Sequence, residues 1–432
     1  MEIIVIGGGA SGMLAAIAAA RNGAKVTIVE KNNMLGKKIL ATGNGRCNFT
    51  NEFCTYIDYL EARDFVKPSL CKFGFDETIG FFRGIGVMEK PEGEGRIYPF
   101  SNQAASVLDA ITFEIDSLKI NILLETSITK LIKDGSKFVL HTSKAEKLVA
   151  DKVIIATGGY AGGVYGCTGE GYKLAQVFGH KLNKPRPALT KLVCKENYYP
   201  QIKGVRARGK VTLKIEGQTK SYSDIGEIQF TEDGISGICV FNISRYVTSK
   251  VSYINKDKRS FNKMKVSDAE TLVESRENPE KVCVAIDFFP ELCEEDLVKI
   301  LEKRKMDLAD RPAGMLLNGM INSKLIPVLL TEIGFEQKKR LCEGIPDGLL
   351  MRISQKLKNW ETIILGTSSF SDAQTTVGGI LRSEVTPETM ESKLISGLYF
   401  AGEILDVDAK CGGYNLQWAW TSGYVAGNSA SS

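Results

Sequence analysis

The sequence predicts an α/β fold in which both ends of the chain form one nucleotide-binding domain and the middle is an insertion. Three observations predict it. A β-branched run at residues 3–6 leads through a glycine turn into an alanine-rich helical segment. Two further strand-like runs end in glycines, within residues 151–159 and 397–402. Between them, from about Ala188, short runs alternate with period two.

The first element is a strand, glycine turn and helix that fits the GxGxxG pattern over residues 7–12. In that pattern Gly7 makes the tight turn, Gly9 lets backbone approach a pyrophosphate, and Gly12 lets the helix pack against the strand. The next strand, residues 25–29, ends at Glu30, which is placed to accept hydrogen bonds from an adenosine ribose. The pattern predicts an ADP-containing dinucleotide rather than a plain βαβ turn, and it leaves FAD and NAD both open.

Two later glycine-rich strands favour the same domain. Residues 151–159 form a hydrophobic strand that ends in Thr157, Gly158 and Gly159. Residues 397–423 show the same pattern of a strand followed by glycine. Gly402 and Glu403 lie at the carboxyl end of the strand, and a double glycine and a helix follow. Ligands of doubly wound sheets lie at the carboxyl ends of the strands. The first and last parts of the chain therefore share one domain.

The middle of the chain predicts a β-rich part and a helical part. Alternating strands are expected over residues 210–217, 226–244 and 281–290, and helices over 294–305, 313–318 and 321–333. Residues 255–281 are charged and predict a solvated excursion. The apolar helical residues either wall a pocket for an apolar substrate or form the helix–helix core. These residues are Leu316, Leu317, Met320, Ile321, Leu325, Ile326, Leu329 and Leu330.

Composition narrows the classes of function. The 432 residues carry 55 basic and 51 acidic side chains, a formal net charge of +4, so nothing in the balance indicates a nucleic-acid partner. The longest apolar runs are strand-length, far below the roughly 20 residues of a membrane-spanning helix. The start of the chain lacks a secretory pattern, which predicts a cytoplasmic protein. Two histidines and ten dispersed cysteines without a CxxC pair predict no metal site.

Several long motifs identify a resemblance. They are GKKILATGNGRCNFTN, GEGRIYPFSNQAASV, ATGGYAGGVYGCTGEGYKLAQVFGH, GEIQFTEDGISG, TTVGGI and TMESKLISGLYFAGEILDVDAKCGGYNLQWAWTSG. Together with the GxGxxG turn and Glu30, they resemble the BaiN-like (YhiN-type) family of bacterial FAD-dependent oxidoreductases, some of which are known as aminoacetone oxidases. The resemblance implies a glutathione-reductase-like FAD domain over residues 1–187 and 355–432. It also implies an inserted antiparallel β-rich domain over 188–290 and 335–354, and a small helical domain over 291–334.

The resemblance also implies the cofactor site. Gly7, Gly9, Gly12 and Glu30 would hold the ADP half, and Glu403 would bind the ribityl chain. Residues 412–416 would begin a helix aimed at the N1/O2 edge of the flavin, where N–H groups stabilise the negative charge of the reduced ring. Because the insert has no second GxGxxG pattern, either NAD(P)H is a transient electron donor that binds without its own Rossmann module, or the electrons come from the substrate itself. The full expected set is Gly7, Gly9, Ala10, Ser11, Gly12, Glu30, Lys31, Lys38, Gly43, Asn44, Gly45, Arg46, Cys47, Asn48, Ser127, Ile128, Ala156, Thr157, Gly158, Gly402, Glu403, Gly412, Gly413, Tyr414, Asn415 and Leu416.

Few residues are candidates for the chemistry. Arg46 either clamps the flavin or a substrate carbonyl, or holds its loop through a salt bridge. Asn48 is a candidate donor to the flavin ring, and Cys47 and Cys411 would be reactive only with a lowered thiol pKa. Five tyrosines are possible proton donors, and Tyr414 has the best motif context; for each, packing is the alternative role. These tyrosines are Tyr98, Tyr160, Tyr165, Tyr172 and Tyr414. Arg46 and Tyr414 are therefore the predicted catalytic residues.

Three functions follow from these observations. The first is an FAD-dependent enzyme that passes hydride from NAD(P)H to a conjugated C=C bond of an apolar ketone, such as a steroid or bile-acid enone. The second is an oxidase of a small amine such as aminoacetone, which produces hydrogen peroxide. The third is a non-catalytic FAD-binding redox sensor. We expect a small apolar substrate as partner, no nucleic acid and no membrane span; the sequence leaves the oligomeric state open.

Overall fold

A computed structural model describes residues 1–247, 281–335 and 341–432. The chain divides into two compact units, the first formed by Met1–Pro187 and Gln374–Ser432 and the second by Ala188–Ala373. The predicted return to the first domain at residue 355 is therefore wrong. Strand β17 (Trp360–Thr367) pairs with β12 and β16 of the second unit. Its side chains alternate between buried and more exposed positions, as expected for a barrel strand with one face inside.

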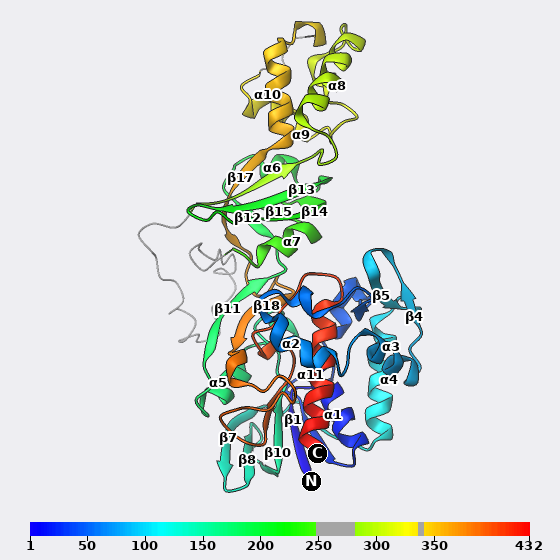
Figure 1. Cartoon of the computed structure of the whole chain (residues 1–432), viewed down its shortest axis with the longest axis vertical. Coiled ribbons are helices and arrows are strands. Elements are labelled where there is room, and N and C mark those ends of the chain that lie inside the picture. Colours follow the sequence, from blue (N-terminus) through cyan, green and yellow to red (C-terminus); the bar gives the residue numbers. More distant parts are fainter. Residues whose placement is uncertain (248–280, 336–340) are drawn as a thin grey trace. The chain divides into compact units, whose positions relative to one another are not determined.

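The first unit is built on a parallel sheet with strand order β19-β10-β1-β2-β6. Its strands are β1 (Glu2–Ile6), β2 (Lys25–Val29), β6 (Asn121–Leu123), β10 (Lys152–Ile155) and β19 (Leu398–Phe400). Figure 1 labels β1 and β10 of this sheet. Strands from both ends of the chain belong to one sheet, because β10 lies between them and pairs with β1 on one side and β19 on the other. This confirms the Rossmann-type sheet and places the carboxyl ends of β1, β2 and β19 at one edge.

Helices α1 (Ala10–Arg21) and α11 (Tyr414–Ser431) lie side by side (Figure 1). Glycines make the close approach possible. A Cβ atom at Gly423 would lie 2.3 Å from Ser11 O, and one at Gly427 would lie 2.2 Å from Ala15 O. The C-terminal helix is thus fixed against the first helix by backbone contact.

Smaller elements complete the first unit. Its antiparallel sheets are β3 (Thr50–Asn51), β5 (Arg96–Pro99) and β4 (Glu89–Pro91), and β7 (Ile128–Asp134), β8 (Lys137–Thr142) and β9 (Lys147–Ala150). A two-stranded sheet joins β11 (Leu182–Ala188) to β18 (Thr375–Ile380). The remaining helices include α2 (Arg63–Leu70), α3 (Phe75–Gly84), α4 (Ala104–Ser117), α5 (Glu170–Gln176) and the 3-10 segments η1 (Ile39–Gly45), η2 (Tyr56–Ala62) and η10 (Gly402–Ile404).

The described strands of the second unit form a closed barrel in the order β12-β15-β14-β13-β16-β17. These are β12 (Leu192–Cys194), β13 (Arg206–Ile215), β14 (Tyr222–Phe230), β15 (Gly234–Ser236), β16 (Val282–Asp287) and β17. Its helices include α6 (Tyr199–Ile202), α7 (Ile238–Ser244), α8 (Glu294–Asp307), α9 (Leu325–Glu332) and α10 (Asp347–Lys358). The charged segment predicted over 255–281 lies outside the described residues, except for Lys281.

Two predictions for the second unit are wrong in detail. Residues 238–244 were expected as strand but form α7, because Gly237 adopts a φ of +113° and buried Cys239, Val240, Ile243 and Ser244 follow helical spacing. The segment 335–354 was expected in the β-rich domain, yet its described residues include most of helix α10, which packs against α8 of the predicted helical domain.

The apolar helical residues of the second unit form its core. Leu316, Leu317, Leu325 and Leu329 are at most 1% exposed and share one hydrophobic cluster with barrel strands. Met320 and Ile321 are partly buried against the same cluster. These side chains therefore fill the interior of the second unit, which agrees with the core alternative for the described residues.

His180 is a packed structural residue of the first unit. Its Nδ1 lies 3.1 Å from Glu384 Oε2 and its Nε2 lies 2.8 Å from Ser392 Oγ. Burial lowers the pKa of His180 below 6.5, although Glu384 acts in the opposite direction. Since the fold favours the neutral ring, the unfolded chain takes up a proton first as the pH falls below 6.5, and stability is lost.

We therefore expect His180→Gln to weaken the loss of stability between pH 7 and pH 5. Glutamine keeps a polar side chain but cannot titrate in this range. Urea unfolding of both proteins at several pH values measures the difference. Parallel pH profiles would show that carboxylates alone cause the acid destabilisation.

Candidate functional site

Of the three GxGxxG glycines in the turn after β1, the protein itself requires Gly7 and Gly12, whereas Gly9 faces open space. Gly7 has a φ of +106°, and a Cβ atom there would lie 2.5 Å from Ala156 O. A Cβ atom at Gly12 would lie 1.9 Å from Gly7 O. At Gly9, no atom lies within 4 Å of the Cβ position. The protein therefore does not explain the glycine at position 9, whereas a ligand close to the backbone does.

The N-terminus of α1 begins at this open position. Gly9 precedes Ala10 and Ser11, and no side chain caps the helix. An uncapped N-terminus presents N–H groups and positive dipole, which suits a phosphate. This end of the site therefore fits the pyrophosphate of a dinucleotide.

Glu30 lies next to the turn, at the end of β2, and is 8% exposed. Its Oε2 accepts a hydrogen bond from Gly8 N at 2.7 Å, and its Oε1 accepts from Asn32 N and Nδ2, both at 2.8 Å. The carboxylate is thus fixed in place, with lone pairs left for a ribose hydroxyl. Thr126 N donates to Glu30 O, which brings the adjoining Ser127 near this end of the site.

The other expected residues near the ADP half have protein partners. Lys31 Nζ donates to Glu170 Oε2 at 2.9 Å. The backbone N and O of Ser127 both bond to Ser143, and Ile128 begins β7. The backbone N–H of Ser127 is therefore already hydrogen-bonded within the protein. These residues shape the site more than they donate hydrogen bonds to a ligand.

Glu403 stands at the carboxyl end of β19 and forms an ion pair across the site. Its Oε2 accepts from Lys38 Nζ at 2.8 Å, and its Oε1 accepts from Thr376 N at 3.0 Å. Burial is the largest single influence and lowers the pKa of Lys38, but Glu403, Cys167 and Tyr165 together raise the pKa above its usual value, so the lysine is charged. Gly402, at a φ of +81°, packs its backbone against Ser11 Oγ. Lys38 and Thr376 thus fix the Glu403 carboxylate just after β19.

The end of η1 and the residues that follow it form a loop whose conformation depends on left-handed backbone. Gly43, Asn44, Gly45 and Cys47 have φ values of +56°, +55°, +82° and +60°. A Cβ atom at Gly43 would lie 2.8 Å from Asn48 N. Consecutive positions of this kind are costly except for glycine and asparagine. The loop therefore has a specific conformation, in which the backbone at Gly43 packs closely against its neighbours, and it is not a linker. We call residues 43–48 the close-approach loop.

Cys47 and Cys411 are not activated thiols. Cys47 is fully buried, and burial raises its pKa to about 12. Burial also raises the pKa of Cys411. Reactive cysteines have lowered pKa values, so the redox chemistry of this site does not come from these two residues.

Arg46 forms the loop-holding salt bridge that was the alternative to a cofactor clamp. Its Nη1 donates to Glu92 Oε1 at 3.0 Å and Oε2 at 3.1 Å. Its guanidinium carbon lies 4.1 Å from the centre of the Tyr98 ring. The side chain is 40% exposed. Arg46 thus ties the left-handed loop to β5 and to the segment after β4.

We expect Arg46→Ala to loosen this loop without unfolding the protein. An exposed ion pair contributes little to stability. The lost cation–π contact, worth about 0.5–1 kcal/mol, should weaken FAD binding by about twofold to fivefold if the loop touches the cofactor.

FAD titration of the apoprotein measures the affinity. The matched control is Arg83→Ala, which removes the exposed ion pair between Arg83 on α3 and Glu89. Equal FAD affinity in the two variants would show that the loop does not contact the cofactor.

The N-terminus of α11 closes the other end of the site. Gly412 and Gly413 have φ values of +124° and +101°, and no side chain caps the helix. A Cβ atom at Gly413 would lie 2.4 Å from Thr50 O and 3.0 Å from Asn48 Oδ1. That Asn48 oxygen is buried and has no hydrogen-bond partner among the described residues. An uncapped helix end beside an unsatisfied amide oxygen indicates a polar ligand here.

Side chains hold the segments around this end together. Asn51 Nδ2 donates to Gly412 O at 2.9 Å, and Tyr59 Oη donates to Tyr414 O at 2.8 Å. Asn415 folds the preceding loop by accepting from Ala409 N and donating to Ala409 O, both at 3.0 Å. The structure therefore brings together the three predicted segments, residues 7–12, 43–48 and 402–416.

Several residues of this site have roles that no sequence pattern predicts. Glu92, Asn51 and Thr376 each hold a predicted site segment, but none lies in a pattern with its own chemistry. Tyr98 was considered only as one tyrosine among five. Its signal was the alternation Arg-Ile-Tyr in residues 96–98, which puts Arg96 and Tyr98 on one face of β5.

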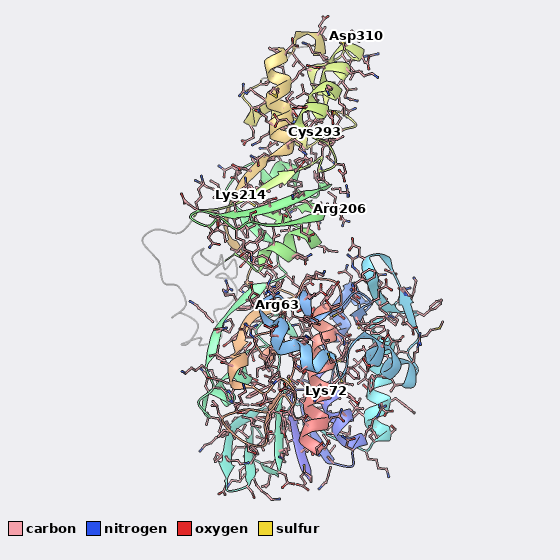
Figure 2. The ribbon with its side chains drawn as sticks, viewed as in Figure 1. Arg63, Lys72, Arg206, Lys214, Cys293 and Asp310 are labelled. Atoms are coloured by element: carbon pink, nitrogen blue, oxygen red, sulfur yellow. The ribbon has the colours of Figure 1, made fainter. Side chains whose placement is uncertain are left out.

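The outward face of β13 carries most of the basic side chains on this strand. Figure 2 labels Arg206 and Lys214 near its two ends. Arg206 pairs with Glu227 and Lys214 with Glu361, each at 3.2 Å, and Arg208 pairs with Glu291. The face therefore carries little net positive charge. Among the described residues, no group of His, Cys, Asp and Glu could hold a metal, and no helix is long and apolar enough to cross a membrane.

Known proteins match this chain over its whole length. The family described as HI0933-like protein Rossmann domain matches residues 1–429. A 3-dehydro-bile acid delta(4,6)-reductase of Clostridium scindens is 39% identical over 435 residues, 99% of this chain and 98% of that protein. A ribosomal RNA dihydrouridine synthase of Haemophilus influenzae is 28% identical over 440 residues, 100% of this chain and 98% of that protein. A 3-ketosteroid delta1-dehydrogenase from Sterolibacterium denitrificans shares the fold, with a TM-score of 0.51 and 13% identity over 99% of each chain.

Proposed function

The chain belongs to the HI0933-like Rossmann-domain family and is an FAD-dependent oxidoreductase, and from this premise we propose that it passes hydride from NAD(P)H, through FAD, to a C=C bond conjugated to the carbonyl of an apolar ketone. Steroid and bile-acid enones are the proposed substrates. The observation that carries the proposal is the 39% identity to a bile-acid reductase over nearly the whole of both chains.

The names of the two relatives support a reductase, because they describe related chemistry. One is a delta(4,6)-reductase of a 3-dehydro bile acid, which is a ketone. The other makes dihydrouridine, which is uridine saturated at the C5–C6 bond beside a ring carbonyl. Hydride addition to a carbon conjugated with a carbonyl accounts for both. The higher identity, 39% against 28%, favours a ketone substrate for this chain.

The residues of the first unit fit FAD along the whole site. The open position at Gly9 and the N-terminus of α1 would hold the pyrophosphate, and Glu30 the ribose. Glu403, fixed by Lys38, would bind the ribityl chain. The N-terminus of α11 would lie at the flavin ring, where its N–H groups favour negative charge. When bound, FAD supplies two-electron hydride chemistry.

Anaerobic stopped-flow measurements on the FAD-loaded protein test the proposal. We expect NADH or NADPH to bleach the flavin, and a 3-oxo-Δ4 steroid to restore its colour. The matching saturated 3-oxo steroid is the control, because it lacks the double bond and should not reoxidise the protein.

A reduced protein that no enone reoxidises would overturn the proposal. Peroxide formation from aminoacetone and oxygen in the same preparation would instead favour the amine-oxidase alternative.

A further inference from the structure

Tyr98 lies on the face of β5 that is turned to the N-terminus of α11. Ile97 is 1% exposed and belongs to the core of the first unit, so Arg96 and Tyr98 share the opposite face. Arg96 is paired in register with Asn51, whose amide donates to Gly412 O. A Cβ atom at Gly43 would lie 3.1 Å from Tyr98 Cε1. The Tyr98 ring therefore packs against the close-approach loop, on the same face as the residue that holds Gly412.

The hydroxyl of Tyr98 has no hydrogen-bond partner among the described residues. The side chain is 6% exposed, and Arg46 covers the ring at 4.1 Å. A tyrosine buried to this extent ordinarily bonds its hydroxyl within the protein. Tyr59, Tyr199 and Tyr399 do so, with Tyr414 O, Thr362 and Ser429 O. The free hydroxyl of Tyr98 is thus available to a ligand.

Tyr172, a second buried tyrosine with an unsatisfied hydroxyl, cannot play the same role. The hydroxyl of Tyr172 also lacks a partner in the described part of the chain, but this oxygen is fully buried. The Tyr98 oxygen is not among the fully buried unsatisfied atoms. Tyr414, the residue with the best motif context, has its ring covered by Lys410 at 4.6 Å, and Lys410 pairs with Asp58.

From this placement we propose that Tyr98 is the proton donor for the enone reduction, with Arg46 as its positioning residue. The inference rests on the proposed function. As hydride reaches the β-carbon of the enone, the π electrons of the C=C bond move to the α-carbon. The O–H bond of Tyr98 breaks and its proton bonds to that carbon. Water then reprotonates the phenolate, so one hydride and one proton saturate the double bond.

The charges around Tyr98 suit an acid. Burial raises the pKa of Tyr98 above 10, and Glu92 and Cys411 also act to raise it. The guanidinium groups of Arg46 and Arg96 act to lower it. Lys90 is its cross-strand partner in β4. The phenol is therefore protonated at neutral pH, and the two arginines stabilise the phenolate left by proton transfer.

The test compares Tyr98→Phe with the wild-type holoprotein, half-reaction by half-reaction. Phenylalanine keeps the ring under Arg46 and against Gly43, so FAD content and flavin reduction by NAD(P)H should be unchanged. Reoxidation by the enone should slow by about 100-fold or more, the contribution of a general acid. The alkaline fall of the wild-type rate should disappear. In D₂O, wild type should place deuterium on one face of the α-carbon, and the variant on both.

The matched control is Tyr56→Phe, a surface tyrosine with Lys67 Nζ 4.9 Å from its ring, which should behave as wild type. Equal reoxidation rates for wild type and Tyr98→Phe would overturn the role of Tyr98 and leave the proposed function intact. The same holds if Tyr414→Phe alone slows reoxidation. If no enone reoxidises the wild-type protein, the proposed function fails and the role of Tyr98 fails with it.

Discussion

Replacing Gly12 by Ala is expected to destabilise the first unit by about 3 kcal/mol and to abolish FAD binding, because overpacking against backbone has no room to relax. The added Cβ atom would lie 1.9 Å from Gly7 O and 3.3 Å from Ala156 Cβ. Helix α1 would have to move away from β1, and the phosphate end of the site moves with it. Thermal unfolding and the absorbance of bound flavin measure the two effects.

Gly9→Ala is the matched variant in the same turn. It should reduce stability only slightly and act mainly on FAD binding. No atom lies within 4 Å of its Cβ position, so the fold should lose only about 0.5–1 kcal/mol, the cost of a poorer N-cap. The methyl group would nevertheless occupy the space assigned to the pyrophosphate. Losing one charge-assisted hydrogen bond, about 2 kcal/mol, would weaken FAD binding about 30-fold.

The two variants distinguish two reasons why the motif contains glycine, namely close approach of the cofactor at Gly9 and packing of α1 against β1 at Gly12. If Gly9→Ala binds FAD as wild type does, the open space at the N-terminus of α1 is not the pyrophosphate site. If Gly12→Ala remains stable and yellow, the helix is less tightly fixed to β1 than its backbone contact indicates.

This contrast also shows what could be predicted from the sequence. The turn at residues 7–12 and Glu30 were predictable, because a strand, a glycine turn and a helix are neighbours in the chain and their geometry is set locally. That the two chain ends share one domain was also predictable, because ligands of parallel sheets lie at the carboxyl ends of the strands. The pairing of β10 with both β1 and β19 was not predicted.

The rest depends on contacts between distant segments. The role of Arg46 is decided by Glu92 and Tyr98, which reach it only after β3, β4 and β5 have paired. The return to the first unit was placed too early because β17 resembles any alternating strand, and only its pairing with β12 and β16 assigns it to the barrel. Residues 238–244 contain β-branched side chains typical of strands, but burial spacing after Gly237 makes them helical.

The second large effect is expected at the opposite end of the cofactor site. Gly413→Ala would add a Cβ atom 2.4 Å from Thr50 O, at a φ of +101°. The control is Gly179→Ala, which has a φ of +87° in the same unit but no atom within 4 Å of the Cβ position. The control variant should lose only the left-handed strain of about 1–2 kcal/mol, whereas Gly413→Ala adds the overlap, about 1–3 kcal/mol more.

The two variants should differ most in the flavin itself. Relief of the overlap requires the N-terminus of α11 to move away from Thr50 and Asn48, and those N–H groups are the ones expected to stabilise negative charge on the reduced ring. Gly413→Ala should therefore bind FAD more weakly and lower the reduction potential of any flavin that remains bound, while Gly179→Ala keeps the wild-type potential. Redox titration against a reference dye measures both. Equal potentials in the two variants would mean that the N-terminus of α11 does not face the flavin ring, because no other difference between these glycines bears on the cofactor.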